Sequence, residues 1–109
     1  MRIWDILPRR LCRAHLLGEH RELHAIWSIL VHHKQGYAYH PETLRWQGKL
    51  KALYLRHEQL VKEMQRRGYK HHSNLDARKA RGKKIQATFV HSPQEQIKIL
   101  RAKKCDCEV

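Results

Sequence analysis

The chain has 109 residues, the size of one ordinary domain, and its 23 lysines and arginines exceed its 10 acidic residues to give a net charge of +13. No run approaches the ~20 apolar residues of a membrane-spanning helix, none resembles a secretory leader, and three cysteines do not suit a secreted disulfide framework. We expect a soluble, cytoplasmic protein (nucleoid-associated in a bacterium), with no membrane partner, whose charge faces a phosphate backbone.

The first predicted helix covers residues 11–34, where apolar residues recur at helical spacing. They are Leu16, Leu23, Trp27, Leu30 and Val31. A break follows at residues 35–39, and we expect Gly36 to supply its turn.

The second predicted helix begins at Pro41, which suits a first helical position, and ends at Gly68 after two arginines. One face carries the residues expected in the core. They are Trp46, Leu50, Leu53, His57, Leu60, Val61 and Met64. Gly48 is expected to split off the first turns.

Residues 69–91 are basic and lack periodicity, so they predict an extended loop. Ser92, Pro93 and Glu95 form a capping box that starts a short helix reaching about Lys103. The sequence therefore predicts an all-α fold, a small bundle of about three helices in a single domain over residues 1–109, with residues 104–109 as a possible flexible tail.

A stripe on the first helix brings together groups that can do chemistry. On a helical wheel His15, Glu19, Glu22 and Ile26 fall within a narrow band, with Gly18 beside it. A glycine costs about 1 kcal/mol in mid-helix and leaves a gap that another atom can approach. The alternative is structural: Gly18 admits a neighbouring helix, Glu22 pairs with an arginine, and His15 is a solvated or satisfied histidine.

The run of residues 14–23, Ala-His-Leu-Leu-Gly-Glu-His-Arg-Glu-Leu, resembles the active-site segment of the pyrimidine-dimer DNA glycosylase/AP lyase family, the phage endonuclease V-like enzymes. Met1 also lies as far before His15 as the processed terminus does in that family. Lys49, Arg56 and the Arg-Gly-Tyr at 67–69 resemble its central helix. The resemblance covers about the first two thirds of the chain.

The resemblance implies a helical fold with the N-terminal segment threaded between helices, and it implies a set of site residues. The free α-amine of Met1 would be the nucleophile, and Glu22 the catalytic carboxylate. Arg2 and Arg21 would hold DNA phosphates, and His15 would support the site.

Two further residues are expected to line the site, Trp4 close to the amine and Gly18 at the gap. Two departures from the family also matter. Its processed first residue is threonine, whereas here a retained methionine is expected, because the bulky Arg2 blocks trimming of Met1. Ala25 stands where the family has a DNA-contacting arginine, which leaves lesion preference open.

The chemistry suits an α-amine, because its reference pKa of about 7.7 to 8.0 lies well below the value of about 10.4 for lysine. Attack at C1′ of the sugar expels the damaged base and forms an imine, after which the 3′ phosphate leaves by β-elimination. Glu22 would serve both stages. The expected substrate is double-stranded DNA with a lesion, a cyclobutane pyrimidine dimer first, with oxidised purine fragments and abasic sites left open. The target base would be extruded by a monomer without metal or cofactor.

Other features of the sequence suggest alternative functions or metal sites. A non-catalytic basic helical nucleic-acid binder fits the composition equally well, and a metal-dependent nuclease is a further alternative. His20 and His24 have the wrong spacing around Glu22 for a zinc-protease helix. Cys105 and Cys107 are a possible metal or redox pair, but a frayed tail is the favoured reading.

Overall fold

The computed structural model describes residues 2–70 and 73–109 and confirms an all-α fold, since these residues form helices and no strand or sheet. The elements are the 3-10 helix η1 (Pro8–Arg10), α1 (Arg13–His32), α2 (Pro41–Leu44), α3 (Leu50–Arg66), the 3-10 helix η2 (Ala77–Lys79) and α4 (Pro93–Ala102). Within these ranges no helix combines the length and the apolar character needed to cross a membrane.

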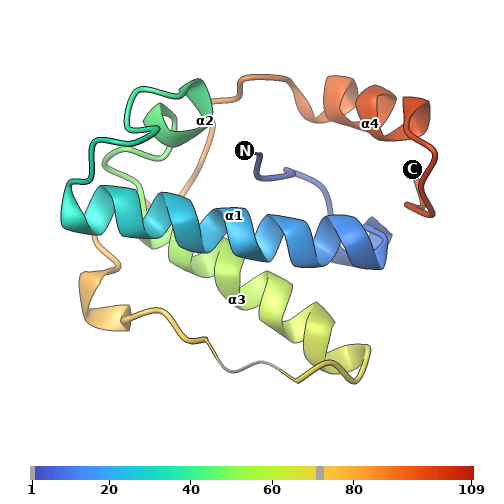
Figure 1. Ribbon diagram of the computed structural model, residues 1–109, viewed down its shortest axis with the longest axis horizontal. Coiled ribbons are helices and arrows are strands. Elements are labelled where there is room, and N and C mark those ends of the chain that lie inside the picture. The colour runs from blue at the N-terminus through green and yellow to red at the C-terminus, as the bar shows by residue number, and fades with distance from the viewer. Residues whose placement is uncertain (1, 71–72) are drawn as a thin grey trace.

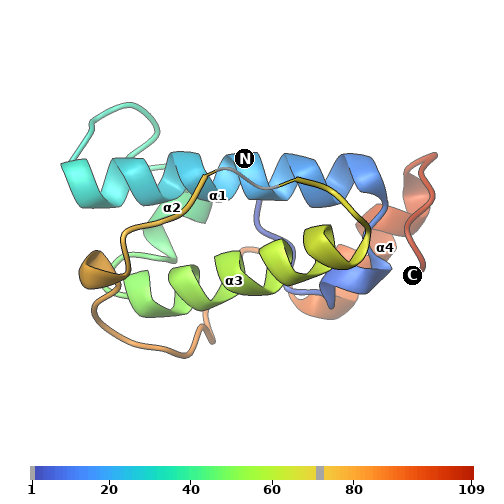
Figure 2. The same ribbon diagram turned by 90° about the horizontal axis from the view of Figure 1, so that it is seen from below.

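Helices α1 and α3 lie side by side and form the centre of the molecule (Figure 2). Their facing leucines, Leu16 and Leu23 on α1 and Leu53 and Leu60 on α3, are fully buried. The helical spacing of these residues places them on one face of each helix, so burying that face holds the two helices together.

The second predicted helix is split in two, as expected at Gly48. This residue has φ +72°, a left-handed conformation that glycine adopts without strain, and it lies between α2 and α3. Gly36 lies in the turn after α1, as predicted, because the Ala38 N–H donates to the Gln35 carbonyl at 3.1 Å across it. The left-handed residues of this loop are His33 (φ 52°) and Tyr37 (φ 58°). Histidine is among the non-glycine residues found more often in this region.

The N-terminal segment runs between α1 and α4, which confirms the threaded arrangement (Figure 1). Ile3, Trp4 and Ile6 are buried in the core. Gln96 of α4 binds the segment from the other side, because its side-chain oxygen accepts from the Asp5 backbone N–H at 2.7 Å and its amide donates to the Asp5 carboxylate at 2.9 Å.

Helix α4 begins with the predicted capping box. The Ser92 hydroxyl accepts from the Glu95 backbone N–H at 3.2 Å, and the Glu95 carboxylate accepts from the Ser92 N–H at 3.2 Å. These two bonds satisfy N–H groups that lack partners at a helix start, which explains why the short helix begins there.

The basic loop is extended over most of its length, as predicted, but it is fixed to the start of α3. The Arg81 carbonyl accepts from the Lys51 N–H at 2.9 Å, and the Lys83 carbonyl accepts from the Ala52 N–H at 3.1 Å. At Gly82 a Cβ atom would lie 2.2 Å from the Gly48 carbonyl oxygen, so only glycine permits this approach.

The last residues, for which the sequence left a flexible tail open, lie against the segment that precedes α1. The Glu108 N–H donates to the Arg10 carbonyl at 2.7 Å, and the Arg10 guanidinium donates to the Glu108 carbonyl at 2.8 Å. The Cys12 N–H is 3.1 Å from the Cys107 sulfur. The C-terminal segment therefore meets the chain at the start of α1.

Candidate functional site

Glu22 faces an open hollow of about 500 Å³ between α1 and the loop that follows it. Ala25 and Ser28 line it from α1, and Tyr37 and His40 line it from the loop. The carboxylate is half-buried and has no hydrogen bond or ion pair with any residue in the ranges 2–70 and 73–109. It is therefore available to a ligand, in contrast to the structural reading in which an arginine neutralises it.

Gly18 leaves the gap that the sequence predicted. A Cβ atom built on this residue would meet no atom of the described chain within 4 Å. The position is half-buried and one turn before Glu22 on α1. The structural reading, in which Gly18 admits a neighbouring helix, is wrong for these residues, and the surface at Gly18 is open.

Glu19 has a role that the sequence did not assign to it. Its buried carboxylate accepts from the Trp4 backbone N–H at 3.0 Å and from two guanidinium nitrogens of Arg56 at 2.7 and 3.0 Å. Burial raises the pKa of Glu19, and the Arg56 charge acts in the opposite direction. The pair fixes the N-terminal segment against the middle of α1.

Arg45 holds the same segment from the end of α2. Its buried guanidinium donates to the Ile3 carbonyl at 3.0 Å, to the Asp5 carboxylate at 2.9 Å and to Glu42 at 2.6 Å. It also donates to the Thr88 carbonyl at 3.0 Å, so it connects the N-terminal segment to the basic loop. Sequence reasoning missed this residue, because its partners are far apart in the chain.

Arg2 lies near Trp4, a second residue predicted at the site, with its guanidinium 4.9 Å from the centre of the indole ring. It also lines a cavity of about 260 Å³ together with His40 and His91. His40 lines the hollow that contains Glu22 as well, so the two spaces are neighbours. Met1, the predicted nucleophile, lies outside the described residues.

His15 packs edge-on against Trp4, with 5.6 Å between ring centres, so two of the predicted residues are in contact. Burial lowers the pKa of His15, and the charge of Lys103 lowers it further, so the neutral imidazole is favoured. Arg21 is exposed and lines a different hollow, with Arg13 and Lys104 among its neighbours. The structure therefore separates Arg21 from the cavity that Arg2 lines.

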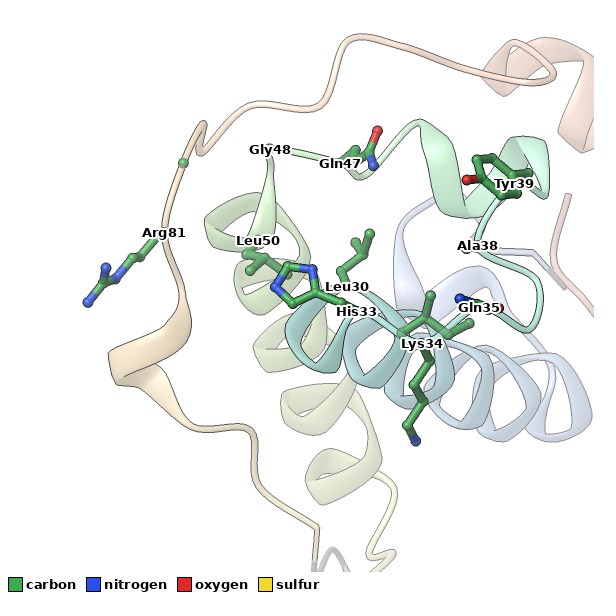
Figure 3. Close-up of a pocket in the computed structure, with 12 residues that line it drawn as sticks. Leu30, His33, Lys34, Gln35, Ala38, Tyr39, Gln47, Gly48, Leu50 and Arg81 are labelled. Carbon is green, nitrogen blue, oxygen red and sulfur yellow. The ribbon is translucent and has the colours of Figure 1, made fainter.

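A larger hollow of about 810 Å³ lies at the far end of α1 (Figure 3). His33, Leu30 and Leu50 gather near its centre, and the side chains of Lys34 and Arg81 point outward. Lys34 also lines the hollow that contains Glu22, so these two hollows adjoin. A continuous depression therefore runs along the C-terminal half of α1 and is bordered by basic side chains.

Two groups of side chains of the kinds that bind metals were not predicted as clusters. One joins Cys12 and His15 to Cys105 and Cys107, and the other joins His20 and His24 to His57. His57 is fully buried, as expected for a core position. The first group had a signal in the sequence, since Cys-x-x-His and Cys-x-Cys are both ligand spacings, but their separation in the chain hid it.

Comparison with known proteins gives one family. A family model described as pyrimidine dimer DNA glycosylase matches residues 1–77, which include α1, α3 and the N-terminal segment. No curated protein and no solved structure matches the chain significantly. The family match covers more than half of the 109 residues. The chain therefore belongs to the pyrimidine dimer DNA glycosylase family.

Proposed function

We propose that this protein is a monomeric DNA repair glycosylase with coupled AP lyase activity that acts on damaged pyrimidines, cyclobutane dimers first, in double-stranded DNA. The family match supports the glycosylase activity and a DNA substrate. One observation supports the position of the active site. The Glu22 carboxylate is half-buried, faces an open hollow, and has no hydrogen-bond or ion-pair partner among residues 2–70 and 73–109.

The surface around this hollow suits DNA. The net charge of +13 favours phosphate binding, and Lys34 and Arg81 border the depression along α1. Tyr37 and Tyr39 are 71% and 85% exposed beside it, so their rings are free to stack on an extruded base.

The proposed nucleophile is the α-amine of Met1. It attacks C1′ of the damaged nucleotide, the glycosidic bond breaks, and the bonding electrons leave with the base, which takes up a proton. The resulting ammonium loses a proton. Its nitrogen lone pair then expels the ring oxygen, which takes up a proton as the ring opens, and a protonated imine remains at C1′. Removal of a C2′ proton then expels the 3′ phosphate with its bonding electrons.

Glu22 is the proposed catalytic carboxylate in both stages. As an anion it stabilises the positive charge that develops on the sugar, and as a base it accepts the C2′ proton. Gly18 provides the open surface on which the sugar lies. The amine is delivered by the N-terminal segment, which Glu19 and Arg45 hold against α1 through Trp4 and Ile3.

The remaining predicted residues have supporting roles in this proposal. Arg2 binds a phosphate beside the cavity that it lines with His40. Arg21 contacts DNA from the separate exposed surface near Lys104. His15 acts as a positioning residue, because its ring packs against Trp4 and so fixes the segment that carries the amine.

The test combines trapping with product analysis on duplexes that contain a cyclobutane dimer or an abasic site. Sodium borohydride should reduce the imine to a stable protein–DNA complex, and the nick should carry the unsaturated sugar end of a β-elimination. Glu22→Gln should abolish base release while DNA affinity stays within about twofold. Binding without a trapped complex would show a non-catalytic binder, and a hydrolytic 3′-hydroxyl end would show a nuclease. Either result would overturn the proposal.

A further inference from the structure

Four ligand-type side chains from opposite ends of the chain converge at the start of α1. Cys12 and His15 lie at the first turn of that helix, and Cys105 and Cys107 lie in the C-terminal segment. Their ligand atoms all lie within 4.8 Å of one another. The His15 Nδ1 atom is 3.1 Å from the Cys12 sulfur and 3.3 Å from the Cys107 sulfur.

These separations are close to those in a tetrahedral metal site. Bond lengths of about 2.3 Å for Zn–S and 2.0 Å for Zn–N place S and N about 3.5 Å apart, and two S atoms about 3.8 Å apart. A single imidazole nitrogen carries one proton or one lone pair, so it cannot bond fully to two sulfurs. A cation at the centre would satisfy all four groups at once.

The groups around these four side chains are also those expected around metal ligands. The Cys12 backbone N–H points at the Cys107 sulfur at 3.1 Å, and such a donor stabilises negative charge on a thiolate. The three cysteines are free thiols that are partly shielded from solvent. Three thiolates and one imidazole form a closed set of the kind found in structural zinc sites, without an open position for a substrate.

We propose that Cys12, His15, Cys105 and Cys107 bind a structural Zn²⁺ ion that fixes the C-terminal segment to the start of α1. The ion also fixes the His15 ring, which packs against Trp4 of the N-terminal segment. His15 is then a metal ligand and cannot serve as a base in the reaction. The site lies apart from Glu22 and takes no part in the chemistry.

Metal analysis of the full-length protein tests this site without any activity measurement. After exhaustive dialysis, wild-type protein should retain thiolate-bound zinc, and Co²⁺ exchanged into it should show intense tetrahedral bands with thiolate-to-metal charge transfer. Cys105→Ser and His15→Asn should weaken binding by more than about tenfold, the lower bound for losing even an outer-shell partner. His33→Asn changes an exposed histidine that follows directly after the same helix and should bind as wild type does.

Alkylation of the thiols tests the same site in the wild-type protein, so it does not depend on whether a variant folds. Wild-type protein with zinc should resist iodoacetamide at all three cysteines, and a chelator should expose all three. Equal alkylation with and without zinc, zinc lost on dialysis, or a disulfide in freshly purified protein would each overturn the proposal. Because no DNA is used, failure here would leave the proposed glycosylase activity untouched.

A different observation supports a second metal site between α1 and α3. The Nε2 atoms of His20, His24 and His57 form a triangle with sides of 3.2, 3.3 and 3.1 Å. Three ligands at about 2.0 Å from one zinc ion in tetrahedral geometry have N···N distances of about 3.3 Å. Among three neutral rings at least one pair has two donors or two acceptors, so hydrogen bonds alone cannot account for the triangle.

The tautomer of His57 suits a metal ligand. The His57 Nδ1 atom is 3.0 Å from the Glu58 carboxylate, which only accepts hydrogen bonds when ionised, so the proton lies on Nδ1 and Nε2 keeps its lone pair. A carboxylate that orients a histidine in this way is typical of zinc sites. We propose that this triangle binds a second Zn²⁺ ion, which joins α1 to α3.

The number of zinc ions bound per protein molecule distinguishes the two proposed sites. Wild-type protein should retain two zinc ions, and His24→Asn or His57→Gln should remove one of them while the thiolate charge-transfer band of the Co²⁺ form is unchanged. His33→Asn again serves as the control. Zinc content unaffected by both variants, or one zinc ion in the wild type that Cys105→Ser removes completely, would overturn the second site and leave the first standing.

Discussion

The backbone N–H of Trp4 donates a hydrogen bond of 3.0 Å to the buried carboxylate of Glu19. The same carboxylate binds Arg56 of α3, so one side chain of α1 connects the N-terminal segment to both central helices. A carboxylate in the core costs free energy unless it is paired. Its presence here is explained by the need to hold the N-terminal segment, from which the proposed nucleophile is delivered.

Glu19→Gln should destabilise the fold by about 3 kcal/mol, because it leaves the Arg56 charge poorly compensated at a site with little exposure to solvent. The remaining amide oxygen can accept from Trp4 or Arg56 but not fully from both. Imine formation per folded molecule should therefore also fall. Denaturant unfolding gives the stability, and borohydride trapping on an abasic duplex gives the imine yield.

Glu22→Gln is the matched control, since it removes a carboxylate one turn later on the same helix that has no partner among the described residues. It should change the free energy of unfolding by less than about 0.5 kcal/mol. If Glu22→Gln destabilised the protein as much as Glu19→Gln does, the division between an anchoring and a catalytic carboxylate would be wrong.

Gly18→Ala should make the protein more stable and less active. Alanine favours a helix interior by up to about 1 kcal/mol over glycine, and the added Cβ meets no described atom within 4 Å. If the sugar lies on this surface, the methyl group should lower kcat/KM at least about tenfold. A stability gain with unchanged kcat/KM would show that the open surface at Gly18 is not used by the substrate.

Acid should weaken the fold through Glu63. Hydrogen bonds from Arg66 and then Arg67 lower the pKa of Glu63 from 4.5 to about 2. Since the folded value lies below the unfolded one, the contribution is complete above about pH 4.5 and is lost as the pH falls toward 2. Solvent screens the exposed Arg66, so Glu63→Gln should cost about 1 to 2 kcal/mol at pH 7. The variant should also show a flatter pH dependence of unfolding across that range than the wild type shows.

Ala25→Arg should tighten DNA binding without changing lesion preference. Ala25 lines the hollow that contains Glu22, so an arginine there can reach a phosphate. One new phosphate contact should steepen the slope of log K against log salt by about 1, equally on damaged and undamaged duplexes. Ala102→Arg adds the same charge at the exposed end of α4 and should leave the slope closer to that of the wild type. Equal slopes for both variants would show that only net charge matters.

Local signals in the sequence were sufficient to predict where the helices lie. Apolar spacing predicted α1 and α3, Gly48 predicted the break before α3, and Ser92 with Glu95 predicted the start of α4. Each of these depends on residues within a few positions of one another, where helix periodicity and capping chemistry act directly. The same periodicity placed Glu22 beside the apolar face of α1, but it did not show that Glu19 and Ile26 of the same stripe are buried.

Contacts between distant parts of the chain could not be predicted in this way. Arg45 binds Ile3, Asp5 and Thr88, and Cys12 meets Cys107, across separations that no helical wheel represents. The basic loop was correctly expected to be extended, but its carbonyl bonds to the start of α3 depend on where Gly82 meets Gly48. Tertiary packing alone determines these pairings.

Identification of the trapped amine shows directly whether the N-terminal nitrogen is the nucleophile. A dimer-containing or abasic duplex is reduced with borohydride in the presence of the protein, the complex is digested, and mass spectrometry locates the sugar adduct. We expect the adduct on the α-amine of the N-terminal residue, with Met1 retained, and no complex after that amine is selectively acetylated. An adduct on a lysine side chain, or full trapping by the acetylated protein, would contradict it.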